Sequence, residues 1–447
     1  MEVGQMDHDV IVVGTRAAGA ATAMLLARAG LRVLAVDRAR FPSDTLSTHQ
    51  VQVPGIARLG RWGVLDRIAA VTPAVPVVRL DAGSAVLEGR YPAVDGVDAL
   101  YGPRRTLLDA ALVDAARAAG AEVREGFAVE ELTRDPEGRI TGIRGRLRGE
   151  GRGRGPDSGR MTATARLVIG ADGKRSMTAQ AVGAGSYHVR QPVTFACYSY
   201  WSGVDVPPGS IHVRSGLTVP AFHTNDGLVM IAMFAPMAEF DRFRADPEAG
   251  YLAALDRCGD LGERVRAGVR AEPFRLAPDV PNLFRTPHGP GWALVGDAGV
   301  VMDPVAGQGI SNAFRDAELL AAAVVRGLDG GGLDEALAGY QRERDAAALP
   351  VFAMTRALAT LRVSGGQRLL LSAIADDPAE TSRFLGVLAG AARYDEYLRP
   401  GNVLGRLGGG VVRRLRRLGR PVTAACVGGG RAPTVAGDAT DATPVSG

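Results

Sequence analysis

Four consecutive segments near the start of the chain constrain its fold more than any other feature. Residues 10–13 are apolar and β-branched, a turn begins at Gly14, small residues at 20–29 favour a helix, and residues 32–37 form a second largely apolar run. Two strands joined through a helix in this order form a βαβ unit, which requires a parallel sheet and a right-handed crossover. The sequence therefore predicts an α/β fold.

The turn of this unit resembles a dinucleotide-binding loop with one departure. Such a loop uses three glycines, and Gly14 and Gly19 stand at the first and third positions while Arg16 replaces the second. Asp37 lies where an acid that binds ribose hydroxyls is expected. A side chain at position 16 crowds the phosphates, but a guanidinium can also bond them from the side. A βαβ turn that binds no nucleotide is the alternative for this motif alone.

Two later segments also end an apolar strand with glycine and aspartate. One leads into Asp172 and Gly173, and the other leads into Gly296 and Asp297, after which a Gly-Gln-Gly loop follows. Over roughly residues 7–320, these motifs in order and spacing resemble the FAD-dependent group A monooxygenases typified by para-hydroxybenzoate hydroxylase. The resemblance is closer to the branch shared with geranylgeranyl reductases and flavin halogenases.

The resemblance implies a doubly wound, Rossmann-like FAD-binding α/β domain with an inserted antiparallel β-sheet substrate domain and C-terminal helices. The expected FAD-binding domain is discontinuous and comprises residues 1–70, 100–184 and 290–349. The expected substrate domain comprises residues 71–99 and 185–289. A helical region at 350–400 and a flexible basic tail at 401–447 complete the expected organisation.

The resemblance also implies a set of residues that contact the cofactor. Arg16 and the glycines of the first loop would hold the pyrophosphate, Arg105 would approach the phosphate and ribityl region, and Asp297 would bond the ribityl chain. A helix after the Gly-Gln-Gly loop would direct backbone N–H groups at the flavin, where negative charge accumulates on reduction. The full expected set is Gly14, Arg16, Ala17, Ala18, Gly19, Asp37, Arg38, Arg105, Asp172, Gly296, Asp297, Pro304, Gly307, Gly309 and Ile310.

The substrate side is less sharply defined. His49 lies in the stretch that passes beside the flavin ring in this fold, and it is either a hydrogen-bond donor or base for substrate or a structural loop histidine. The candidates for the pocket wall are the aromatic residues and histidine Tyr198, Tyr200, Trp201, His212 and Phe222. Alternation along a strand allows only Tyr198 and Tyr200, or Trp201 with its own alternating neighbours, to face one pocket.

The activity that the resemblance implies is monooxygenation, by hydroxylation or epoxidation, of a hydrophobic small molecule in specialised metabolism. NAD(P)H, binding transiently, would reduce FAD, and O₂ would add at flavin C4a to give a hydroperoxide that delivers one oxygen atom. Two alternatives stay open: an alkene reductase similar to geranylgeranyl reductase, and a non-redox enzyme, such as a cyclase, that retains FAD. Halogenation is disfavoured because the sequence has no Trp-x-Trp-x-Ile-Pro element and its one lysine, Lys174, lies in the Asp-Gly motif.

Composition and charge disfavour several other classes of protein. The formal net charge of +4 is concentrated after residue 400, and no basic run with interleaved aromatic residues predicts a nucleic-acid site. Three scattered cysteines and no cluster of histidines predict neither a disulfide framework nor a metal site, which favours a reduced cytoplasmic setting. No apolar run is long enough to cross a membrane. Helices are expected at 333–347 and 350–361, and the tail is expected to be unstructured apart from a short helix at 411–418. Nothing in the sequence indicates the oligomeric state.

Overall fold

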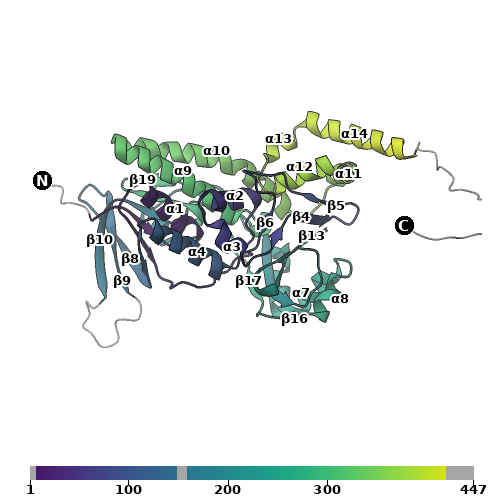
Figure 1. Ribbon diagram of the computed structural model, residues 1–447, viewed down its shortest axis with the longest axis horizontal. Coiled ribbons are helices and arrows are strands. Elements are labelled where there is room, and N and C mark those ends of the chain that lie inside the picture. The colour runs from purple at the N-terminus through teal and green to yellow at the C-terminus, as the bar shows by residue number, and fades with distance from the viewer. Residues whose placement is uncertain (1–6, 148–158, 419–447) are drawn as a thin grey trace, which may run out of the picture.

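The computed structural model describes residues 7–147 and 159–418, which fold as an α/β structure with two large sheets (Figure 1). The predicted fold class is confirmed. Residues 148–158 lie outside the described residues, and so do residues 419–447, which belong to the tail predicted to be flexible.

The first sheet contains the predicted βαβ unit and is mainly parallel. Its strand order is β19-β20-β10-β1-β2-β7, and only the edge pair β19 and β20 is antiparallel. The strands on this path are β1 (His8–Val13), β2 (Val33–Asp37), β7 (Glu122–Glu125), β10 (Arg160–Gly170), β19 (His288–Gly289) and β20 (Trp292–Leu294). β2 is buried along its whole length because other elements cover both faces of the sheet.

Helices cover one face of this sheet. They bury the alternating side chains of β1, β2 and β10 that point toward them, in one core cluster. These helices are α1 (Ala17–Arg28), α2 (Val53–Arg61), α3 (Leu65–Ala69), α4 (Arg105–Ala118) and α9 (Gly309–Gly330). α10 (Leu333–Ala359) lies alongside α9 at the outer edge (Figure 1).

The other face differs from a helix-covered doubly wound sheet. β8 (Phe127–Arg134) and β9 (Ile140–Leu147) form an antiparallel meander with the first half of β10, and the short helix α5 (Met177–Ala181) packs beside it. Apolar side chains of the meander, such as Phe127 and Ile143, pack against Ile11 and Val36 of the parallel sheet. Alternate side chains of these strands are apolar and point at the parallel sheet, so the meander covers the face that a helix covers in a doubly wound fold.

The second sheet is built from residues inserted between parts of the first. Its order is β16-β12-β15-β14-β13-β4-β5, with β17 also paired to β12, and every pair is antiparallel except β4 with β13. The strands are β4 (Val77–Asp81), β5 (Val86–Arg90), β12 (Thr194–Ser202), β13 (Gly209–Arg214), β14 (Leu217–His223), β15 (Val229–Pro236), β16 (Val269–Arg270) and β17 (Arg275–Ala277). One face packs on α6 (Phe240–Ala245), α7 (Pro247–Asp256) and α8 (Leu261–Ala267).

Short strands form two further small sheets: β3 (Ala74–Val75) pairs with β6 (Leu100–Tyr101), and β11 (Ser186–Arg190), β18 (Asn282–Arg285) and β21 (Val300–Val301) form the other. The 3₁₀ turns are η1 (Asn225–Gly227), η2 (Met237–Glu239), η3 (Gly296–Ala298) and η4 (Pro304–Ala306).

The C-terminal region contains two departures from the sequence predictions. The helices expected at 333–347 and 350–361 form one helix, α10, which continues through Pro350. The tail is also more ordered than expected, because α14 (Pro400–Leu418) begins directly after the helical region and packs on α11 (Gly365–Ile374). Gly410 allows the close approach, since a Cβ there would lie 2.6 Å from the Cβ of Ala373. α12 (Pro378–Leu388) and α13 (Tyr394–Tyr397) complete this region.

No helix among residues 7–147 and 159–418 is long and apolar enough to cross a membrane. The same residues contain no group of three or more histidine, cysteine, aspartate or glutamate side chains arranged to hold a metal ion.

Candidate active site

The glycine turn after β1 creates an open, electropositive helix end. Gly14 has φ +95°, and a Cβ on it would lie 2.6 Å from the Ala171 carbonyl oxygen, while a Cβ on Gly19 would overlap the Gly14 carbonyl. α1 then begins at Ala17 with no side-chain hydrogen bond at its N-cap. The N–H groups of the first turn therefore have no side-chain cap, which is the arrangement that binds a phosphate.

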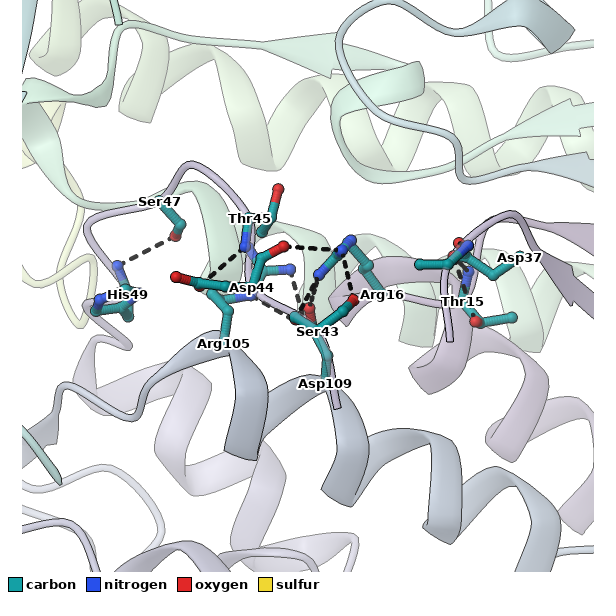
Figure 2. Close-up of polar contacts among 11 residues, drawn as sticks. Thr15, Arg16, Asp37, Ser43, Asp44, Thr45, Ser47, His49, Arg105 and Asp109 are labelled. Carbon is teal, nitrogen blue, oxygen red and sulfur yellow. Dashed lines mark hydrogen bonds and ion pairs between the residues drawn. The ribbon is translucent and has the colours of Figure 1, made fainter. Parts of the chain in front are cut away.

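Asp37 ends β2 beside this turn (Figure 2). One carboxylate oxygen accepts from the Thr15 backbone N–H at 2.7 Å, and the other accepts from the Ala39 N–H at 2.8 Å. A carboxylate oxygen accepts more than one hydrogen bond, so Asp37 retains acceptor capacity for a ribose hydroxyl. Arg38, the next residue, is exposed.

The Arg16 side chain lies in a network that the sequence analysis did not foresee. Its guanidinium donates to the Asp109 carboxylate at 2.7 Å, to the Ser43 hydroxyl at 3.0 Å and to the carbonyls of Ser43 and Asp44 at 3.2 Å (Figure 2). Asp109 is fully buried and accepts from Arg105 as well, at 2.9 and 3.0 Å. Arg16 and Asp109 together therefore join the start of α1 to α4 and to the loop after β2.

A signal for Asp109 was present in the sequence. Arg105 and Asp109 are four residues apart, so they lie on the same face of α4 and pair there. The contact with Arg16, 93 residues away in the chain, has no local signature. Whether Arg16 also reaches the pyrophosphate stays a prediction.

Asp172 forms its hydrogen bonds within the turn and short helix that follow it. Its carboxylate accepts from the Ser176 hydroxyl at 2.5 Å and from the backbone and hydroxyl of Thr178 at 2.9 and 3.1 Å. These bonds fix the turn after β10 against Gly14, whose hypothetical Cβ would lie 3.1 Å from the Asp172 Cα. Asp172 thus holds one side of the phosphate turn in place through the backbone.

Asp297 and Gly309, the first residue of α9, are both exposed. Gly296 has φ +60° and approaches Ala18 so closely that a Cβ would lie 2.7 Å from the alanine Cβ. The Asp297 side chain is exposed, yet the surrounding protein raises the pKa of its carboxyl by desolvation, which the charge of Arg105 partly offsets.

The Gly-Gln-Gly loop leads directly into α9. A Cβ on Gly307 would lie 2.5 Å from the Gln50 side-chain oxygen, whereas a Cβ on Gly309 would meet nothing within 4 Å. α9 starts at Gly309 without a side-chain cap, and Gly309 is exposed. A long helix with an open N-terminus stabilises negative charge placed there. Pro304 lies just before this loop in η4, and Ile310 is buried in the first turn of α9.

His49 lies in the loop between β2 and α2, at φ +45°. Its Nε2 is hydrogen-bonded to the Tyr200 hydroxyl, and the two rings stack with centroids 5.3 Å apart. Burial and the charges of Arg104 and Arg105 hold the pKa of His49 well below its usual range, so the imidazole is neutral near pH 7. Its Nδ1 is buried without a hydrogen-bond partner among the described residues.

The five candidates for the pocket wall do not lie together. Tyr198 joins the His49 site, because its hydroxyl accepts from the Ser47 N–H at 3.0 Å. Trp201 points to the opposite face of the sheet, where its ring stacks on Tyr251. Alternation along β12 therefore separates Trp201 from the two tyrosines, so only one of the two sets can face a given pocket.

The other two candidates also lie elsewhere. Phe222 packs in the core with Tyr198 and Tyr200, and His212 lies 3.6 Å from the Asp81 carboxylate on β4. None of the five candidates lines the apolar cavity described next.

An apolar cavity of about 180 Å³ connects the Gly307 loop with the C-terminal helices. Its walls come from the loop after β2, the β13–β15 face of the second sheet, and α10 to α12. At the end beside Gly307 the wall contains the neutral polar residues Thr48, Gln50 and Gln52. The Oε1 of Gln52 is buried and has no hydrogen bond among the described residues.

A comparison with known protein families identifies the family of the chain. Residues 7–242 match the family described as the FAD binding domain. The chain belongs to this FAD-binding domain family. It is a flavin-dependent oxidoreductase.

Individual relatives of this FAD-binding domain protein carry different activities. It is 29% identical to the menaquinone reductase of Mycolicibacterium smegmatis, over 71% of this chain and 76% of that protein. It is 30% identical to the aklavinone 12-hydroxylase DnrF of Streptomyces peucetius subsp. caesius, over 73% of this chain and 70% of that protein. The solved structure of the flavin-dependent brominase Bmp2 superposes with a TM-score of 0.74 at 16% identity, over 92% of this chain and 99% of that one.

The residues of this FAD-binding domain protein fit the cofactor. Gly14 and Gly19 provide a cradle that a Cβ would fill, and the uncapped starts of α1 and α9 offer free N–H groups to the phosphates and to the flavin. Asp37 and Asp297 are carboxylates with acceptor capacity for the ribose and ribityl hydroxyls.

Proposed function

We propose that this protein is an FAD-dependent monooxygenase that hydroxylates or epoxidises a hydrophobic small molecule with NAD(P)H and O₂. The observation that carries the proposal is the apolar cavity that begins beside Gly307 and the open N-terminus of α9. An apolar substrate held there lies next to the position that the flavin takes in this family and is shielded from water.

The proposed cofactor contacts follow the geometry of the site. The first turn of α1, with Ala17, Ala18 and Gly19, would hold the pyrophosphate, and Asp37 with Arg38 would bind the adenosine end. Asp297 would accept from the ribityl hydroxyls, and Arg105, fixed by Asp109, would supply positive charge to the same region.

When bound, FAD supplies the redox chemistry, taking electrons from NAD(P)H and activating O₂. The protein's own residues bind and orient the substrate. Gln52 lines the cavity, and its Oε1, which is buried without a partner among the described residues, would accept a hydrogen bond from a substrate hydroxyl. The uncapped N-terminus of α9 would stabilise negative charge on the bound cofactor.

His49 is proposed as a positioning residue. Its ring is neutral and bonded to Tyr200, which the Arg104 guanidinium covers at 4.0 Å from the ring centroid. This arrangement fixes the loop from Ser47 to Gln52 that forms the inner wall of the cavity. A role as general base would require substrate to reach the unpaired Nδ1.

The test is a product analysis under ¹⁸O₂. FAD-loaded protein, NADPH or NADH, and a panel of apolar aromatic and isoprenoid compounds are incubated, and substrate-stimulated NAD(P)H oxidation selects the compound for mass spectrometry. The proposal expects one ¹⁸O atom in the product. Turnover without label incorporation contradicts it.

A reductase is the second candidate, favoured by the 29% identity to a menaquinone reductase. It would yield a product with two added hydrogen atoms and no ¹⁸O. A non-redox enzyme that retains FAD would convert substrate with no NAD(P)H at all. Halogenation stays disfavoured, because Lys174 pairs with Asp279 and does not line the cavity.

The expected cytoplasmic location stays a prediction. It is compatible with Cys197 and Cys258, which are buried free thiols. Nucleic-acid binding is not part of the proposal.

A further inference from the structure

The apolar cavity has a second end with a different chemical character. A wider pocket of about 830 Å³ lies beyond it and shares wall residues with it, including Val213, Ala357 and Arg362. We call this wider pocket the vestibule; its other walls include Ser84, Arg214, Ser364 and Arg368. The two spaces therefore adjoin, and we take them together as one passage from the vestibule to the Gly307 loop.

The vestibule is positively charged. No aspartate or glutamate lines it or the cavity, whereas Arg214, Arg362 and Arg368 do. Arg214 is neutralised by Asp81, whose carboxylate accepts from it at 2.9 Å. Arg362 and Arg368 are exposed and form no ion pair within the described part of the chain. Two uncompensated guanidinium groups therefore stand at the mouth of an apolar passage.

α11 adds to this charge because its N-terminus lies in the vestibule wall. Ser364 caps the helix and forms a reciprocal capping box with Gln367. The positive end of the helix dipole therefore lies beside the two arginines.

No charged side chain lines the inner end of the passage, and the proposed flavin takes the α9 N-terminus beside it. The polar wall residues of this end, Thr48, Gln50 and Gln52, are neutral, and the rest of the cavity is lined mainly by aliphatic and aromatic side chains. A carboxylate or phosphate moved there would lose its hydration without gaining a cationic partner. An anionic ligand is therefore held more favourably with its charge in the vestibule than at the inner end.

We infer that the substrate is an amphipathic molecule with an apolar body and one anionic terminal group, a carboxylate or a phosphate. The anionic group rests in the vestibule on Arg362 and Arg368, and the opposite, uncharged end reaches the Gly307 loop. The site of oxidation is consequently remote from the anionic group. This inference names the substrate class of the proposed function and rests on it.

The test measures binding to the FAD-loaded protein by isothermal titration calorimetry. The probes are dodecanoate and dodecyl phosphate, with dodecanol as the uncharged analogue of the same chain length. We expect at least one anionic probe to bind about tenfold more tightly than dodecanol, and this preference to shrink as NaCl is raised. Comparison of dodecanoate with dodecyl phosphate identifies which anion fits.

Variants assign the effect to the two arginines. Arg362→Gln and Arg368→Gln should each weaken binding of the preferred anion about five- to tenfold and leave dodecanol unchanged. Arg356→Gln is the matched control, because Arg356 is exposed on α10 but lines neither space. It should change neither affinity.

Three results overturn the inference: equal affinity for charged and uncharged probes, loss of dodecanol binding in the arginine variants, or no saturable binding of any probe. These readouts need no turnover. A protein that incorporates ¹⁸O but shows no anion preference would refute the substrate class alone, and one that shows the preference without incorporating oxygen would refute the monooxygenase proposal alone.

Discussion

Replacing Asp109 with asparagine should destabilise the protein far more than the small change in size suggests. The side chain is fully buried and holds Arg16 at 2.7 Å and Arg105 at 2.9 Å. Asparagine has nearly the same shape as aspartate, so Asp109→Asn creates no cavity. It removes the negative charge that compensates two guanidinium groups in the interior.

The magnitude follows from how much of each partner is exposed. The Arg105 side chain is only 10% exposed, so its charge would be left buried without a counter-ion. Breaking a buried pair in this way costs about 3–5 kcal/mol. Arg16 is 27% exposed and keeps its bonds to Ser43 and Asp44, and the amide oxygen still accepts one bond. We therefore expect the lower end, a loss of about 3 kcal/mol in the free energy of unfolding.

The assay is urea unfolding of the FAD-free protein followed by circular dichroism, under the same conditions for every variant. Asp114→Asn is the matched control, because Asp114 lies on the same helix, is 48% exposed and pairs with Arg67 at 2.7 Å. An exposed pair contributes about 0–1 kcal/mol. If the two variants lose the same stability within about 1 kcal/mol, the role assigned to Asp109 is refuted.

Three further predictions concern cofactor, pH and chain length. Asp297→Ala should weaken FAD binding by about 1–3 kcal/mol, because ribityl hydroxyls lose their acceptor; unchanged affinity in a fluorescence titration would show that the ribityl chain lies elsewhere. The pKa of His49 is lower in the folded protein than in the unfolded chain. Below about pH 6.5 only the unfolded chain binds a proton at His49, so the free energy of unfolding falls as pH falls, whereas above about pH 7 His49 has no effect on its pH dependence. His49→Gln should therefore flatten the pH dependence of the unfolding free energy between pH 7 and 5, and an identical slope in both proteins would contradict the assignment. Deletion of residues 419–447 should leave FAD content unchanged, whereas deletion of 401–447 removes the Arg406–Glu380 ion pair and should lower the melting temperature; equal melting temperatures would mean that α14 contributes nothing.

The parts of the site that the sequence predicted are those that depend on local backbone geometry. Gly14 and Gly296 have positive φ and approach neighbouring backbone or side chains too closely for a Cβ, so glycine is required and its spacing is visible in the sequence. Asp37 and Asp297 follow strands whose carboxyl ends meet at one edge of the sheet. In a parallel α/β sheet, residues that directly follow a strand lie at this edge, so their location can be predicted from the order of strands and helices in the sequence.

The parts that the sequence did not predict depend on contacts between distant segments. The bond from Arg16 to Asp109 crosses 93 residues and has no local pattern. The cavity wall combines the loop after β2, the second sheet and α10 to α12, so no single segment carries its signature. The aromatic residues of β12 became pocket candidates because of their residue type. In the structure Trp201 and Tyr200 are buried in two different core clusters, where they pack against neighbouring elements.

Oxygen incorporation tests the central claim most directly. The FAD-loaded protein is supplied with NAD(P)H, ¹⁸O₂ and an apolar acid that stimulates NAD(P)H oxidation, and the product is weighed by mass spectrometry alongside a reaction under ¹⁶O₂. The account predicts that each product molecule carries one ¹⁸O atom and that its formation matches NAD(P)H consumption. A product that gains two hydrogen atoms and no ¹⁸O, or one that forms without NAD(P)H, would contradict it.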